Sequence, residues 1–235
     1  MLIRFGLLAF GSLLLSASAF AQTSDADNCA KAAGDSAIAA CSEIIAAGDG
    51  AEVSWALFDR ARAYFNEKMY GSAVDDLTEV LRFRPDDTQA LENRGLAFLA
   101  MDDYGRAIGD FGKVIDLQPT SVAAWRERCW THAAAGRDLD DALEDCNKAL
   151  SLKANDAAAL DARCFVQLRL SAYAAAITDC SAAAAADPQL ASSRYLRGVA
   201  KNKAGDVAGG DADIDAARAR DPDIAQTFAN YGVKP

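Results

Sequence analysis

Proline recurs in this sequence at intervals close to 34 residues, and this period limits the fold more than any other feature. Pro85 and Pro119 are 34 residues apart, Pro188 follows after 69 residues, and Pro222 follows after another 34. The middle interval is therefore two periods plus one residue. A fixed internal period of about 20–50 residues is typical of repeat proteins, in which each copy packs mainly against its neighbours. The sequence predicts a row of similar units.

Small residues share the period of the prolines. Between them, apolar residues recur at helical spacing, as at Phe111, Val114 and Ile115, and stretches such as "RPDD" and "QPTS" interrupt the pattern. Each copy is therefore predicted to form two helices joined by a turn, and the one extra residue falls in "AGRDLDD". The small residues are Ala61, Gly95, Cys129, Cys164 and Gly198, followed twelve or thirteen positions later by Ala73, Ala107, Ala142, Ala176 and Gly210. Polar residues after two of the prolines are expected to cap the next helices: Asp86, Asp87, Thr120 and Ser121.

This pattern resembles the tetratricopeptide repeat, whose order of small, aromatic and proline positions is visible in "LENRGLAF", "YGRAIGDFGKVIDLQP" and "YGSAVDDLTEVLRFRP". The resemblance implies an all-α fold, a right-handed α-solenoid of antiparallel helical hairpins in which neighbouring copies stack. Departures are cysteine at the small position of two copies, Gly210 in place of alanine, and Lys153-Ala154 in place of a proline. The resemblance covers five copies, at residues 54–87, 88–121, 122–156, 157–190 and 191–222.

The segments outside the repeats have their own signatures. Residues 1–21 have the order of a cleavable secretory signal, with a basic residue, an apolar run and then Ala19-Phe20-Ala21. A membrane anchor is the alternative, but the apolar run is short and no stop-transfer pattern follows it. Residues 22–50 are expected to form a partial helical hairpin, and residues 223–235 a capping helix with a tail.

Charge and composition narrow the possible partners and compartments. The formal net charge of −10 makes nucleic acid and anionic lipid poor partners, and no membrane span is expected in the mature chain. Hydrophobic residues make up 51% of the chain but aromatic residues only 8%, which suits closely packed, alanine-rich helices. The signal predicts export, to the periplasm or beyond the cell, where disulfides persist.

The six cysteines are predicted to form three disulfides, each inside one hairpin. Residues at equal distances from a turn lie side by side in an antiparallel hairpin, so the midpoint of a bonded pair should fall on a turn. Facing Cα atoms of helices in contact are ~4–5 Å apart, which is close to what a disulfide requires. A redox or metal role is the alternative, although the sequence contains no C-x-x-C motif. The pairs are Cys29 with Cys41, Cys129 with Cys146, and Cys164 with Cys180, with midpoints in "AGDS", "AGRDLD" and "LSAY".

A ladder of opposite charges also follows the period. An arginine precedes each small residue of the first helix, and an aspartate recurs in the second helix. Salt bridges are the simpler interpretation, because arginine's planar fork suits such pairing better than lysine would. An anion-binding stripe is the alternative. The arginines are Arg60, Arg94, Arg128, Arg163 and Arg197, and the aspartates are Asp76, Asp110, Asp145, Asp179 and Asp213.

The resemblance to tetratricopeptide repeats places a ligand surface on the concave face, lined by the first helix of each copy. Aromatic and arginine side chains there resemble the anchors of peptide grooves. Packing between neighbouring helices is the alternative role for each. Asp161 also falls on this face. The residues expected to bind a partner are Phe58, Arg62, Phe65, Arg126, Trp130, Phe165 and Tyr195.

The functional prediction is an exported, non-catalytic scaffold that binds a protein or an extended peptide through its concave face. His132 is the only histidine, and neither neighbour supplies a nucleophile or an acid, so no catalytic residue, metal or cofactor is predicted. A protein that exchanges disulfides with its clients is the alternative from a different class. A carrier of small ligands is a third, which would require a closed pocket.

Overall fold

The computed structural model describes residues 27–31, 33–48 and 50–234. The secretory signal predicted at residues 1–21 lies outside the described residues. The chain divides into two compact units, an N-terminal unit that ends at Phe83 and a C-terminal unit that begins at Arg84. Each unit is described by itself.

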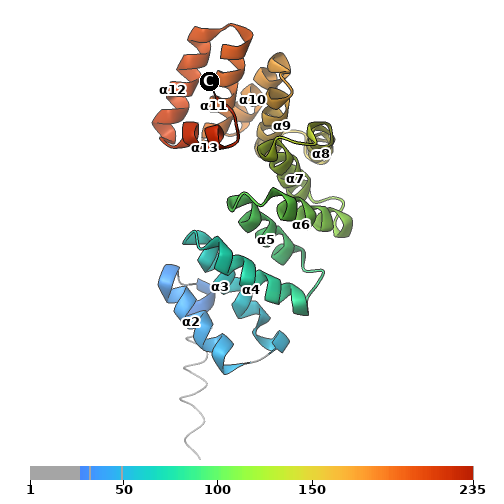
Figure 1. The fold of residues 1–235 in the computed structure, drawn as a ribbon, viewed down its shortest axis with the longest axis vertical. Coiled ribbons are helices and arrows are strands. Elements are labelled where there is room, and N and C mark those ends of the chain that lie inside the picture. Colours follow the sequence, from blue (N-terminus) through green and yellow to red (C-terminus); the bar gives the residue numbers. More distant parts are fainter. Residues whose placement is uncertain (1–26, 32, 49, 235) are drawn as a thin grey trace, which may run out of the picture. The chain divides into compact units, whose positions relative to one another are not determined.

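Throughout the described residues the regular structure is helical (Figure 1). The N-terminal unit contains a helical segment at 27–31, α2 (Gly34–Ala47), the short 3-10 helix η1 (Gly50–Val53), α3 (Ser54–Asn66) and α4 (Tyr70–Phe83). The C-terminal unit contains α5 (Thr88–Ala100), α6 (Tyr104–Leu117), α7 (Val122–Ala135), α8 (Leu139–Leu152), α9 (Ala157–Arg169), α10 (Tyr173–Ala186), α11 (Ala191–Ala204), α12 (Val207–Arg220) and α13 (Ile224–Asn230).

Consecutive helices pack as antiparallel hairpins, one for each predicted repeat (Figure 1). The pairs are α3 with α4, α5 with α6, α7 with α8, α9 with α10, and α11 with α12. The first helices of neighbouring repeats also touch, α7 against α9 and α9 against α11. The all-α hairpin fold predicted from the period is confirmed.

After Pro85 and after Pro119, one of the two polar residues caps the helix that follows. The side chain of Asp87 accepts a hydrogen bond of 3.0 Å from the backbone N–H of Ala90, and Ser121 accepts one of 3.2 Å from that of Ala124. These bonds satisfy backbone donors that have no partner within the helix. Asp86, the other residue of the first pair, instead forms an ion pair with Lys113.

The turns inside the hairpins explain the extra residue of the third repeat. Four hairpins turn through a single residue with positive φ: Lys68, Asp102, Ser171 and Gly205. The α7–α8 turn has two, Gly136 at φ 68° and Asp138 at φ 51°. The inserted residue therefore lengthens a turn, so neither helix changes its phase.

Small residues allow the two helices of a hairpin to approach closely. A Cβ atom on Gly95 would lie 2.8 Å from the ring of Phe111, and one on Gly198 would lie 2.7 Å from the backbone oxygen of Gly210. Real Cβ atoms do not make such contacts, because they fall well inside van der Waals separation. The recurring small position is therefore a packing requirement, and in the last repeat it lets two backbones meet.

All five predicted arginine–aspartate pairs are present, and each joins the two helices of one hairpin. The guanidinium donates two hydrogen bonds of 2.5–2.8 Å to the carboxylate in every repeat. Three of the arginines also reach the second helix of the preceding hairpin, where Arg60 donates to Ser42, Arg163 to Asn147 and Arg197 to Ser181. The ladder therefore links helices within and between repeats.

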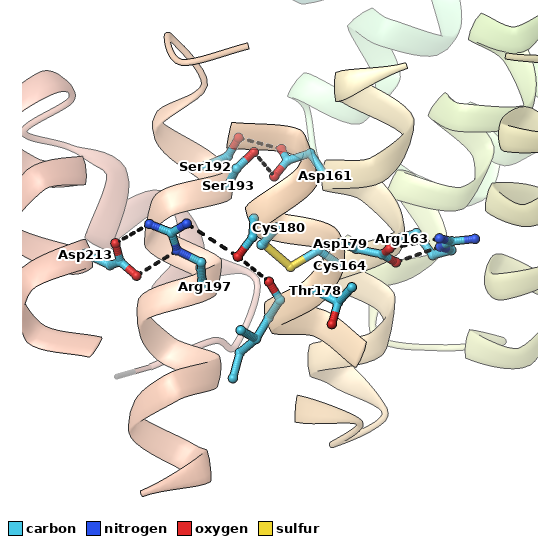
Figure 2. The surroundings of a disulfide bond; sticks show 12 residues. Asp161, Arg163, Cys164, Thr178, Asp179, Cys180, Ser192, Ser193, Arg197 and Asp213 are labelled. Carbon is cyan, nitrogen blue, oxygen red and sulfur yellow. Dashed lines mark hydrogen bonds and ion pairs between the residues drawn. A yellow bond between two sulfur atoms is a disulfide. The ribbon is translucent and has the colours of Figure 1, made fainter. Parts of the chain in front are cut away.

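Three disulfides join the cysteines that mirror one another across the hairpins. Their Cα atoms are 4.7 Å apart for Cys29–Cys41, 5.5 Å for Cys129–Cys146 and 5.4 Å for Cys164–Cys180. These are the pairs that the midpoint argument predicts. Figure 2 shows the last of them between α9 and α10, level with the ion pairs on either side.

Removing one disulfide is expected to weaken one hairpin without unfolding the chain. Replacing Cys164 and Cys180 together by alanine should lower the free energy of unfolding by about 2 kcal/mol, the low end of the usual range, because the Arg163–Asp179 pair still joins the same helices. Urea unfolding followed by circular dichroism measures the change. Loss of helix in the absence of urea would contradict this expectation and make the disulfide a condition for folding.

Candidate functional site

An aromatic cluster forms on one side of α7, α9 and α11 in the C-terminal unit. We call this side the aromatic face and define it by Trp130, Phe165 and Tyr195. The rings of Trp130 and Phe165 lie 5.0 Å apart, centroid to centroid. All three residues are predicted from the sequence to bind a partner, and the fold brings them together on neighbouring helices.

The aromatic face is covered by the chain's own C-terminal segment. Phe228 of α13 stacks on Tyr195 at 5.2 Å and meets Phe165 edge to face at 5.5 Å. It also lies 6.1 Å from Trp130, so one side chain contacts all three helices. Aromatic pairs of this kind contribute about 0.5–1.5 kcal/mol each beyond the area they bury.

This packing buries two of the three residues that are predicted to bind a partner. Phe165 and Tyr195 are both 0% exposed, so a partner cannot reach them in this structure. The cause is the fold-back of α13, which the repeat period does not encode. Trp130 is only half-buried, so part of its side chain stays exposed.

Polar groups hold the same segment in place. The guanidinium of Arg169, at the end of α9, donates a hydrogen bond to the backbone carbonyl of Tyr231. A cation at the carbonyl end of a helix is electrostatically favourable. Burial and the charge of Asp102 raise the pKa of the Tyr231 hydroxyl, against a hydrogen bond with Trp130 that lowers it. We call residues 224–234 the tail segment.

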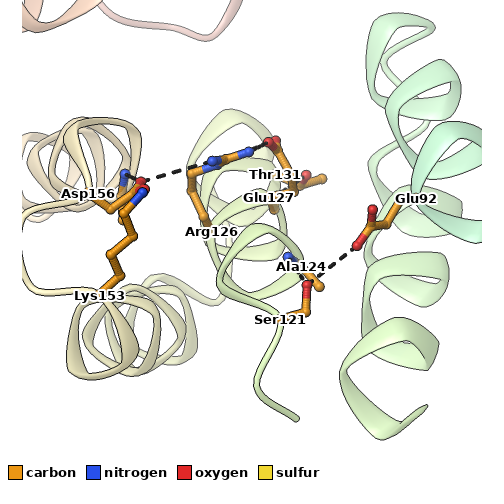
Figure 3. Close-up of polar contacts among 9 residues, drawn as sticks. Glu92, Ser121, Ala124, Arg126, Glu127, Thr131, Lys153 and Asp156 are labelled. Carbon is orange, nitrogen blue, oxygen red and sulfur yellow. Dashed lines mark hydrogen bonds and ion pairs between the residues drawn. The ribbon is translucent and has the colours of Figure 1, made fainter. Parts of the chain in front are cut away.

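Arg126, also predicted to bind a partner, is engaged by acidic neighbours (Figure 3). Its guanidinium donates two hydrogen bonds to Glu127, at 2.5 and 3.1 Å, and lies 4.0 Å from Asp156. Nearby, the Ser121 hydroxyl faces Glu92 at 3.4 Å, and burial raises the pKa of the Glu92 carboxyl. A ligand at Arg126 would have to compete with two carboxylates.

The matching side of α3 in the N-terminal unit remains accessible. Phe58 and Phe65 are half-buried, and the Arg62 side chain is 57% exposed. Arg62 makes only a local ion pair, 3.2 Å from Asp59 on the same helix. Phe65 packs edge to face on Tyr70 at 5.2 Å. These three predicted residues are therefore placed where a partner can reach them.

Asp161 is a buried carboxylate that the sequence analysis placed on the concave face. It lies instead between α9 and α11, where it accepts hydrogen bonds of 2.5 Å from Ser192 and 2.7 Å from Ser193 (Figure 2). Burial raises its pKa from an ordinary 3.8 to about 6, against the two serine hydroxyls, which lower it. Such a group is costly to ionise, because the two hydroxyls replace its water only in part.

Comparison with solved structures identifies the fold. A tetratricopeptide repeat protein from Parabacteroides merdae ATCC 43184 is 20% identical, with a TM-score of 0.66 over 83% of this chain and 77% of its own. TTC0263, a thermophilic TPR protein of Thermus thermophilus, is 15% identical, with a TM-score of 0.65 over 76% of this chain and 97% of its own. YrrB, described as a TPR protein with an unusual peptide-binding site, is 16% identical, with a TM-score of 0.55 over 80% of this chain and 96% of its own.

The chain has the tetratricopeptide-repeat fold. No family model and no curated protein matches it. The similarity is therefore one of fold, and the chemistry of this chain has to be derived from its own side chains.

The sequence predicts no metal site, no reactive thiol and no catalytic histidine. The described part of the chain contains no group of three or more potential metal ligands and no free cysteine. Burial lowers the pKa of His132, and its Nδ1 atom lies 3.7 Å from a carboxylate oxygen of Asp138. None of the described helices combines the length and the apolar character needed to cross a membrane.

Disulfide exchange, the alternative function, is not favoured by the position of the sulfur atoms. All six cysteines are bonded and at most 2% exposed. Exchange begins with attack of a thiolate on an accessible sulfur atom, which this burial prevents. Each disulfide instead joins the two helical segments of one hairpin.

Proposed function

We propose that this protein is a non-catalytic scaffold that binds a protein or an extended peptide through the first-helix face of its repeats. One observation carries the proposal: the aromatic face, assigned to partner binding by the repeat resemblance, packs a polypeptide segment through its rings. The surface is therefore of a kind that binds a peptide. The peptide-binding site named for YrrB supports the same mode of action.

In the N-terminal unit, the proposed contact with the partner is made by α3. Phe58, Arg62 and Phe65 lie on α3 three or four residues apart, so they share one face of that helix. An aromatic pair flanking an exposed arginine combines apolar anchoring with a planar donor for carboxylates.

Export to the periplasm is the second part of this proposal. Three buried disulfides in a chain of this size support an oxidising compartment, because cytosolic proteins keep their thiols reduced. The signal-like order of residues 1–21 supports the same destination. The partner is accordingly an exported or envelope protein.

Capture of partners from the exported fraction tests the binding face. Arg62→Ala should reduce the recovery of crosslinked partners about tenfold, the effect of removing one anchor of about 1.4 kcal/mol. Arg82→Ala is the matched control, since Arg82 is also a mostly exposed arginine, at 65%, in an ion pair with an acid three residues earlier. Equal recovery with both variants would contradict the assignment of the face.

A further inference from the structure

The contacts that the tail segment makes indicate what kind of ligand the aromatic face binds. We propose that the aromatic face recognises a short amphipathic helix with two aromatic residues three positions apart, and that the tail segment is an internal copy of this ligand. An external ligand then binds only when the tail segment leaves. This inference rests on the proposed function and specifies what one of its surfaces binds.

The tail segment has little stability of its own. Its helix, α13, has only seven residues. A helix of this length is unstable in water, because helix nucleation is costly and few backbone bonds follow. The contacts with the aromatic face must therefore hold it, and weakening one of them should release the segment.

The contacts define a pattern that another peptide could reproduce. Phe228 fills the space between Trp130, Phe165 and Tyr195, and Tyr231, three residues later, lies 5.9 Å from Phe165. Tyr231 is the C-cap of α13, directly after its last residue, and residues three apart at the end of a helix lie on the same side. Arg169 then binds the carbonyl at the end of the segment. Ile224 and Val233 of the tail segment are also buried in this cluster, so a peptide that reproduces its packing needs apolar residues at those two positions as well.

The tail segment does not satisfy every group around the face. A cavity of about 730 Å³ remains beside it, lined in part by Tyr104, Arg169, Tyr173 and Lys203. The hydroxyl of Tyr195 is buried and has no hydrogen-bond partner among the described residues. A buried hydroxyl without a partner is unfavourable. Tyr195 does not line the cavity, however, so the room for a ligand larger than the tail segment comes from the cavity itself.

Attachment to the chain gives the tail segment its advantage. A short connection to α12 holds it near the face at an effective concentration in the millimolar range. A free peptide with the same contacts therefore competes poorly with the intact protein. It should bind well once the internal copy loses an anchor.

Peptide binding to the full chain tests the inference. The probe is a fluorescently labelled peptide with the sequence of residues 221–235, "DPDIAQTFANYGVKP", and the readout is fluorescence anisotropy. We expect Phe228→Ala in the protein to tighten binding of this peptide at least tenfold over the unaltered protein. The same peptide with alanine in place of its own phenylalanine should not bind either protein.

Two further variants separate release of the segment from general loss of stability. Phe111→Ala removes another fully buried phenylalanine, in α6, and should leave the weak binding of the unaltered protein unchanged. Tyr231→Ala weakens the tail segment at a half-buried residue and serves where Phe228→Ala does not fold. It too should tighten peptide binding.

Two results would overturn the inference. One is equal binding of the peptide to the unaltered protein and to a folded tail variant, and the other is binding to neither. In both cases the proposed function is tested independently, by the effect of Arg62→Ala on partner capture. Arg62 belongs to the N-terminal unit and its ion pair is local to α3, so this effect does not depend on the tail segment.

Discussion

Phe165→Ala is expected to lower the free energy of unfolding by about 3–5 kcal/mol, the usual cost of removing a buried phenylalanine. The side chain is 0% exposed and touches Trp130, Phe228 and Tyr231, so its loss leaves a cavity between α9 and the tail segment. Urea unfolding of the purified protein measures the change. Folded Phe165→Ala protein should still capture partners through α3.

Phe65→Ala is the control for that experiment. Phe65 is half-buried and meets only Tyr70 among the aromatic rings of the described residues, so its loss should cost about 1 kcal/mol and reduce partner capture instead. A change of less than about 1 kcal/mol for Phe165→Ala would place that residue outside the core. It would also favour the role in partner binding that the sequence predicts for Phe165.

The repeated hairpins could be predicted because each depends on residues close together in the sequence. The small position and its partner in the next helix, such as Gly95 and Phe111, are sixteen residues apart, or seventeen in the third repeat, and they recur at every period. The disulfide pairs follow from the same mirror relation, with one deviation. The midpoint of Cys29 and Cys41 falls at residue 35, inside the first turn of α2 rather than before it, because that helix begins at Gly34.

The position of the tail segment could not be predicted in the same way. The period places Phe165 and Tyr195 on the side of their helices that faces a ligand. It does not show whether another segment of the same chain covers that side. Phe228 comes to lie 63 residues from Phe165 in sequence, beyond the last complete repeat. One signal was present: "TFANY" carries two aromatic residues at helical spacing in a segment expected only to cap the array.

Asp161 shows a second limit of the repeat pattern. Most helix positions tolerate a carboxylate on an exposed face, and the period assigns Asp161 to such a face. Its burial depends on Ser192 and Ser193 at the start of the next repeat, which supply the two hydroxyls that it requires. Its partners are thus neutral, whereas each aspartate of the ladder is paired with an arginine.

Asp161→Asn is expected to stabilise the protein at neutral pH and to have no effect in acid. The pKa of Asp161 in the folded protein is about 6, above its ordinary 3.8, so the fold favours the protonated carboxyl. Below pH 3.8 both states are protonated and the contribution to stability is fully present. Between the two values the unfolded chain loses its proton first, and stability falls as pH rises, by up to about 3 kcal/mol in total.

Asparagine removes this loss, because its amide has no charge and can bond both serines. Urea unfolding at a series of pH values should therefore show no difference between the two proteins near pH 3.8 and a growing advantage for the variant up to pH 7. Arg126 and Glu127 line the same pocket as Asp161, but they neutralise each other and are unchanged in both proteins. A difference that stays constant with pH would show that the carboxyl titrates normally. A variant less stable at pH 7 would show that the ionised form is the one the fold requires.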